Sequence, residues 1–226
     1  MPLAEEIDEV FDLAWIRTAV PFVEEEMATD GSHDQGHLLR VMRNARAICR
    51  GESESGHDPD RDVVAAAVLA HDLVNLPKDH PERETASTRS AEKACEFYQV
   101  LGIFDQSQLD RIYEAIERHS FSRDLEPESL EAEIVSDADD LDALGAVGIA
   151  RTFHVSGAIG GRICHPVDPF GEERALDDST FAVDHFFEKL LELPGRFHTD
   201  TGREMARRRA DYMEGYLDRL SEEVEG

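Results

Sequence analysis

The stretch VVAAAVLAHDLVN at positions 63–75 decides the fold. Its first eight residues are apolar on every side of a helix, so this helix must be buried all round. Eight residues are too few to cross a bilayer, which takes roughly 20. His71 and Asp72 follow at the end of the helix. Because an ionised carboxylate beside a core is costly unless it is paired or binds a metal, this end is the first candidate site.

Apolar residues recur at helical spacing along most of the chain, and no segment shows the alternation of a strand. The sequence therefore predicts an all-α protein. The expected helices are Leu13–Met27, His37–Cys49, Arg61–Asp72, Thr85–Val100, Gln108–His119, Asp139–Val155, Thr180–Leu191 and Thr201–Val224. Segment 156–178 is rich in Gly and Pro and too long for a plain connector, which predicts a long loop that serves as a lid or an interface.

The chain has 226 residues and a formal net charge of −27. This length suits one domain or a small pair of domains, and it is enough to bury a hydrophobic core. So negative a field repels nucleic-acid polymers and anionic lipid, and the acidic N-terminal segment is unlike a signal peptide, so we expect a cytoplasmic protein without a membrane partner. Lys occurs only three times among 23 basic residues, a composition that also predicts a halophilic, salt-adapted protein.

Two further histidines are expected to point toward the core. His37 lies on one helical face with apolar positions 41, 45 and 48, and His119 follows Ile112 and Ile116 at helical spacing. A single inward histidine is more often a satisfied core residue than a ligand. Two of them, together with the pair at 71–72, favour convergence on one ion, for which imidazole and carboxylate are suitable donors.

The run SDADDLDALGAVGIAR at 136–151 is the densest acidic segment in an apolar setting. Capping of a helix N-terminus and interaction with its dipole would explain about two of its four leading Asp residues. Asp139 shares a face with Ala143 and Ala146, and small residues allow another helix to approach closely. Asp139 is therefore expected to lie against the helices that carry the histidines.

Four residues in three short runs carry a family resemblance: His37 in GHLLRV, His71 and Asp72 in LAHDLVN, and Asp139 in DADDLDALGAVGIAR. In this order they resemble the H…HD…D signature of the HD-domain metal-dependent phosphohydrolase superfamily. The chain is similar in particular to the stand-alone YedJ-like and YpgQ-like members, over residues 30–224. One departure is Asp140, which stands where the family usually has Arg.

The resemblance implies a single-domain, HD-type helical bundle at 30–224, and we expect residues 1–29 to form an N-terminal helix packed on it. It also implies one divalent metal ion, Mn, Ni, Co, Fe or Mg, with four ligands: His37, His71, Asp72 and Asp139. Asp137 is the alternative for the last ligand. Asp139 is preferred because Asp140, Leu141 and Asp142 follow it in the pattern that the superfamily shows after its ligand.

The implied activity is hydrolysis of a small phosphate ester or anhydride, foremost a nucleotide, by attack of a metal-activated water on phosphorus. Asp72 would steer or deprotonate the water, and His119 would bind phosphate or protonate the leaving group. Positive charge for the phosphate would come from Lys78 and Arg83, in the loop after the HD pair, and from Arg118.

His33 and Asp34 are expected just outside the ligands, where a carboxylate can fix the tautomer of a ligand imidazole, although Asp34 is equally well explained as a helix cap. Three alternatives stay open at this point. They are a phosphodiesterase acting on cyclic or linear dinucleotides, a non-catalytic nucleotide-sensing module, and a purely structural metal protein. A homodimer is compatible with each of them.

Overall fold

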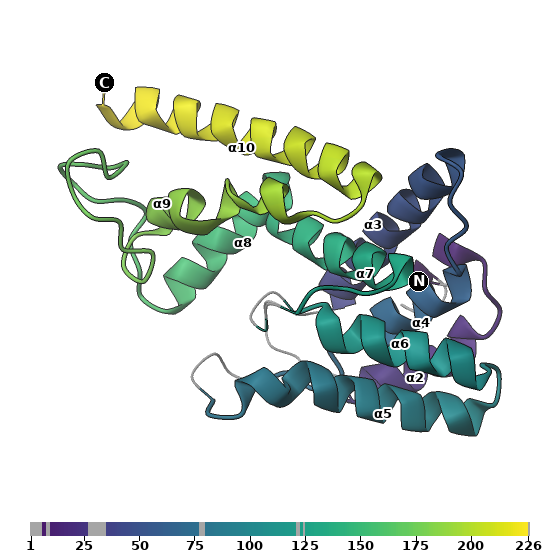
Figure 1. Cartoon of the computed structure of the whole chain (residues 1–226). Helices are drawn as coiled ribbons and strands as arrows, with labels where there is room; N and C mark the ends of the chain where they lie inside the picture. Colours follow the sequence, from purple (N-terminus) through teal and green to yellow (C-terminus); the bar gives the residue numbers. More distant parts are fainter. Residues whose placement is uncertain are drawn as a thin grey trace. The chain divides into compact units, whose positions relative to one another are not determined.

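The structure of the protein is a computed structural model that describes residues 6–7, 10–26, 35–76, 80–120, 123 and 125–225 (Figure 1). Three of the predicted site residues, His33, Asp34 and Lys78, lie outside the described residues. The chain divides into two compact units, Met1–Asp139 and Asp140–Gly226. Each unit is described by itself.

The first unit is built from helices of moderate length. They are α2 (Ile16–Glu26), α3 (Gln35–Glu54), α4 (Arg61–Ala70), α5 (Ala86–Leu101), α6 (Gln106–Arg118) and α7 (Leu130–Asp140), with a short 3₁₀ turn at Arg83–Thr85. Helices α5 and α6 lie side by side as an antiparallel pair (Figure 1). Because α6 returns along α5, the start of α5 and the end of α6 lie at the same end of this pair.

Helix α4 is the centre of the first unit. Residues 63–70 are at most 1% exposed, and α4 packs against α2, α3, α5 and α6. Asp60 caps its N-terminus by accepting hydrogen bonds from the backbone N–H groups of Asp62 and Val63. The burial predicted from the apolar run is therefore confirmed. His71 and Asp72, which follow Ala70, lie at the C-terminal end of this central helix.

The second unit holds α8 (Gly145–Ala158), α9 (Ala182–His185) and the long α10 (Asp200–Glu225), which packs against α8 (Figure 1). Its remaining elements are a 3₁₀ turn at Leu141–Ala143, a π-helical turn at Phe186–Leu190 and a further 3₁₀ turn at Leu193–Arg196. Residues 159–181 contain no helix. An isolated bridge between Arg162 and Phe181 joins the two ends of this segment.

The all-α class is confirmed, since the described residues contain no strand beyond that isolated bridge. No helix within the described ranges is long and apolar enough to cross a membrane. The division into an N-terminal helix at 1–29 and a main domain at 30–224 stays a prediction.

One expected helix was wrong. The segment 139–155 was predicted as a continuous helix that starts near Asp139, but α7 ends at Asp140 and α8 begins only at Gly145. Leu144 is extended and Gly145 has a φ of 71°, a left-handed conformation that favours glycine, so the chain turns between the two helices. Asp139 therefore lies at the C-terminal end of a helix, not at its N-terminal end.

Candidate metal centre

Four predicted side chains meet within the first unit. His37 Nε2 lies 3.3 Å from His71 Nε2 and 3.4 Å from Asp139 Oδ1. Asp72 Oδ2 lies 4.0 Å from His37 Nε2 and 3.6 Å from His71 Nε2, and Asp139 Oδ1 lies 3.8 Å from His71 Nε2. Both imidazoles are buried, whereas the carboxylates are partly exposed. The cluster thus has a buried nitrogen side and an accessible oxygen side.

The spacing of these donor atoms fits a shared metal ion. Two atoms that bind one ion at about 2.1 Å are about 3 to 4 Å apart, depending on the angle between them. The separations in the cluster, 3.3 to 4.0 Å, fall in this range. Two neutral imidazoles with two carboxylates form a donor set that divalent transition metals accept. The residues present therefore fit the ion that the sequence predicts.

Helix ends bring the four residues together. His37 lies in the first turn of the described part of α3. His71 caps the C-terminus of α4, and Asp72 follows it in a turn. His71 keeps a helical backbone conformation, and the side chains of both neighbours reach one cluster, although those of adjacent residues in an ideal helix point about 100° apart.

The position of Asp139 also argues for a cation. It is the penultimate residue of α7, so its carboxylate lies at the helix end that carries partial negative charge. Capping of a helix N-terminus, which would explain about two of the four leading Asp residues, therefore does not account for Asp139. Helices α4 and α6 also end beside the cluster, at His71 and His119. Three carbonyl ends and two carboxylates together create a field that favours a positive ion.

The orientation of His71 is set by its backbone. Its Nδ1 lies 2.7 Å from the carbonyl oxygen of Val68, so Nδ1 carries the hydrogen and Nε2 presents its lone pair to the cluster. Burial lowers the pKa of His71 below its ordinary value by more than the carboxylates of Asp72 and Asp139 raise it. The neutral imidazole, which is the form that binds a metal, is therefore favoured.

His119 lies beside Asp72, and one of its ring nitrogens is also within 4.8 Å of donor atoms of His71 and Asp139. Its Nδ1 is 2.6 Å from the carbonyl oxygen of Ile116, and its Nε2 is 3.7 Å from Asp72 Oδ1, the oxygen that does not face His37. Burial lowers the pKa of His119, but interactions with Asp72 and then the charge of Asp139 outweigh burial and raise the pKa above its ordinary value. His119 thus adjoins the cluster and shares a carboxylate with it.

The two predicted cations that the structure describes, Arg83 and Arg118, have partners elsewhere in the protein. Arg83 donates a hydrogen bond to the carbonyl oxygen of Leu76. Arg118 donates to the Glu128 carboxylate at 2.6 Å and lies 3.6 Å from Glu114. Both guanidinium groups are therefore engaged by the chain's own acceptors. Neither is brought into the cluster by a described contact.

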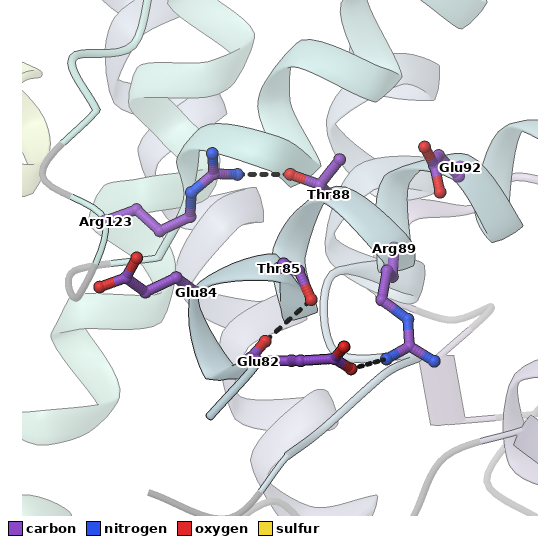
Figure 2. Close-up of a pocket in the computed structure, with 7 residues that line it drawn as sticks. All are labelled: Glu82, Glu84, Thr85, Thr88, Arg89, Glu92 and Arg123. Atoms are coloured by element: carbon purple, nitrogen blue, oxygen red, sulfur yellow. Dashed lines mark hydrogen bonds and ion pairs between the residues drawn. The ribbon is translucent and has the colours of Figure 1, made fainter. Parts of the chain in front are cut away.

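A surface pocket of about 520 Å³ lies at the start of α5 (Figure 2). Arg123 donates to Thr88 Oγ1 at 2.5 Å and lies 3.5 Å from Glu117, and Arg89 lies 3.8 Å from Glu82. The guanidinium groups of Arg89 and Arg123, which line the pocket, are thus engaged by Glu82, Thr88 and Glu117. Arg123 was not predicted, although its position four residues after His119 was a signal.

Two other buried residues, Asp137 and Asn44, lie on the helices that carry Asp139 and His37. Asp137, the predicted alternative to Asp139, is 1% exposed and belongs to neither group of metal-competent donors found among the described residues. Asn44, which was not predicted, donates from Nδ2 to the carbonyl oxygen of Ala138 at 3.0 Å, directly before Asp139 in the chain. Its position seven residues after His37, two helical turns along α3, was visible in the sequence.

Comparison with known proteins identifies similar chains of nearly the same length. The profile of the HD domain family matches residues 35–144, a range that contains all four clustered side chains. The uncharacterized protein YpgQ of Bacillus subtilis is 36% identical over 211 residues, which cover 89% of this chain and 90% of YpgQ.

Solved structures agree with this match. The crystal structure of Bacillus subtilis YpgQ in complex with ADP has a TM-score of 0.67 at 30% identity and covers 100% of this chain and 98% of that chain. An HD-superfamily hydrolase from Bacillus thuringiensis has a TM-score of 0.70 at 26% identity and covers 99% of each chain.

Proposed function

Because the chain belongs to the HD-domain family of metal-dependent phosphohydrolases, we propose that it hydrolyses a small phosphate ester or anhydride, foremost a nucleotide. The predicted single-domain, HD-type helical fold is confirmed by matches along nearly the whole chain. The observation that carries the proposal is the convergence of two imidazoles and two carboxylates from separate helix ends. The ADP in the YpgQ complex supports a nucleotide as the first substrate to test.

The proposed centre contains one divalent ion, Mn, Ni, Co, Fe or Mg, with four protein ligands: His37, His71, Asp72 and Asp139. When bound, such an ion polarises a phosphoryl oxygen and lowers the pKa of water beside it. His33 and Asp34 stay proposed as outer residues that orient a ligand imidazole.

Asp72 and His119 are the proposed catalytic residues. Asp72 presents Oδ2 to His37 and His71, and it presents Oδ1 to His119. One oxygen can therefore bind the metal while the other orients or deprotonates the attacking water. His119 holds its Nδ1 on a backbone carbonyl and its Nε2 3.7 Å from Asp72 Oδ1, so Nε2 is the atom that we propose to protonate the leaving group or to bind phosphate.

Binding an anion in a chain with a net charge of −27 requires local positive charge. Lys78, Arg83 and Arg118 are the proposed phosphate-binding residues. Arg118 must compete with Glu114 and Glu128 for a substrate, since both already engage its guanidinium group. We therefore expect Lys78, in the loop after the HD pair, to contribute the most.

A metal and substrate screen tests this function. The purified protein is analysed for bound metal and then incubated with a panel of nucleotides and each candidate ion, while released orthophosphate and pyrophosphate are measured. Metal-dependent turnover that is lost in His71→Ala is the expected result. Turnover of cyclic or linear dinucleotides alone would assign a phosphodiesterase instead, and a protein that binds nucleotide without turnover with any ion would be a sensing module.

A further inference from the structure

A buried hydrogen bond links two of the helices that form the cluster. Asn44 is 6% exposed, and its Nδ2 donates to the carbonyl oxygen of Ala138 at 3.0 Å. Asn44 lies on α3, two turns after His37 and on the same face, and Ala138 directly precedes Asp139 on α7. This contact therefore joins the helix that carries one imidazole to the helix end that carries one carboxylate.

The Ala138 carbonyl is one that α7 itself cannot satisfy with an α-helical bond. It is among the last four carbonyls of α7, which ends at Asp140 and gives way to a 3₁₀ turn at Leu141–Ala143. The side-chain amide of Asn44 supplies a donor at this end. Without it, a buried carbonyl would lose a partner, and the last turn of α7 would lose a fixed attachment to α3.

We propose that Asn44 is a positioning residue that sets the carboxylate of Asp139 against the imidazole of His37, an inference that rests on the proposed metal centre. His37 Nε2 and Asp139 Oδ1 lie 3.4 Å apart, within the range that two ligands of one ion require. A shift of α7 along α3 would change this separation directly. Asn44 thus acts on the metal through Asp139 and does not touch the ion.

The test compares two variants of Asn44 with a matched control. Asn44→Leu keeps the volume but removes the donor, and Asn44→Ser fits without strain but is too short to reach the carbonyl. The control is Tyr98→Phe, because the fully buried Tyr98 hydroxyl also donates to a helix carbonyl, that of Ala66, at 2.9 Å. All three changes remove one buried hydrogen bond to a helix.

The readouts are the dissociation constant for Mn²⁺, by calorimetric titration, and the thermal unfolding of the metal-free proteins. We expect both Asn44 variants to bind Mn²⁺ at least about tenfold more weakly, the lower end of the effect of residues that orient ligands. Tyr98→Phe should lower the unfolding temperature by a similar amount and leave the Mn²⁺ affinity within about twofold of the wild type. Wild-type affinity in a folded Asn44 variant, or an equal loss in Tyr98→Phe, would overturn the inference.

Asp139→Ala separates this inference from the proposed metal centre. If the wild-type protein binds no Mn²⁺, or if Asp139→Ala binds it as tightly as the wild type, the proposed centre is wrong. If Asp139→Ala loses Mn²⁺ while both Asn44 variants retain wild-type affinity, the centre stands and only the positioning role fails.

Discussion

Replacing Asp139 by alanine should remove the metal and leave the metal-free fold nearly unchanged. The change deletes one of four proposed ligands, an oxygen that lies 3.4 Å from His37 Nε2 and 3.8 Å from His71 Nε2. Mutation of a residue that only orients a ligand lowers the metal affinity about 10- to 100-fold. A direct ligand should therefore cost more than about 100-fold, or more than about 2.7 kcal/mol.

The metal-free protein should tolerate this loss. The Asp139 side chain is 24% exposed, and its charge lies at the unfavourable end of α7. We expect the free energy of unfolding without metal to change by less than about 1 kcal/mol, which in a chain of this length shifts the unfolding temperature by no more than about 4 °C.

Asp137→Ala is the matched comparison, because the same substitution is made two residues earlier on the same helix. The Asp137 side chain is buried, and its loss should leave a partner unsatisfied at a cost of about 1 to 3 kcal/mol. The unfolding temperature should fall by about 2 to 12 °C while the Mn²⁺ affinity stays within a few-fold of the wild type.

Elemental analysis, calorimetric Mn²⁺ titration and scanning calorimetry after chelation measure all of these quantities. If Asp137→Ala loses the metal and Asp139→Ala keeps it, the assignment of the fourth ligand is refuted.

Three further predictions follow from the same geometry. Lys78→Ala should raise the KM for a phosphorylated substrate with metal content unchanged, and loss of metal on elemental analysis would contradict its proposed role. His119→Asn should retain the Mn²⁺ affinity and lower kcat by about 10²- to 10⁴-fold, and unchanged turnover would exclude it from proton transfer. Asp60→Ala should lower the free energy of unfolding by about 0.5 to 2 kcal/mol at neutral pH, through loss of the α4 cap. Burial raises the pKa of Asp60, but hydrogen bonds that include those of Gln108 and Arg111 outweigh it and lower the pKa below its ordinary value. The difference in the free energy of unfolding between wild type and Asp60→Ala should therefore be full above about pH 4 and vanish as the pH falls through the folded pKa of Asp60. Urea unfolding of both proteins at pH 7 and pH 3 measures this difference, and an equal difference at the two pH values would contradict the prediction.

Much of the fold was predictable because burial leaves a periodic pattern in the sequence. The apolar run 63–70 predicted a helix buried on all sides, and α4 is that helix. The face shared by His37 and positions 41, 45 and 48 predicted an inward imidazole, and all four residues are buried. Patterns of this kind record which face of a helix meets the core, irrespective of how the helices are arranged.

The geometry of the candidate site was less predictable because helix ends build it. Helix α7 was missed because five of its 11 residues, LEAEIVSDADD, are acidic, and three of these five were interpreted as part of the start of the next helix. The break after Asp140 depends on the left-handed conformation of Gly145, which helical spacing does not reveal. The convergence of His71 and Asp72 on one cluster was likewise not predictable from spacing alone, because side chains of adjacent residues in an ideal helix point about 100° apart.

Asn44 shows a different limit. Its place on the inner face of α3 follows from the spacing after His37, but its partner is a backbone carbonyl 94 residues away. A backbone atom carries no residue identity, so no pattern in the sequence marks such a contact.

The three carbonyl ends that surround the cluster also fix an order of events. A phosphorylated substrate that arrives before the cation meets the negative ends of α4, α6 and α7 together with two carboxylates, and all of these repel it. Once the cation is bound, the same approach becomes attractive. In the proposed function, we therefore expect the ion to bind before the phosphate or as a complex with it, and a substrate in large excess over the ion to slow its own hydrolysis by sequestering that ion in solution.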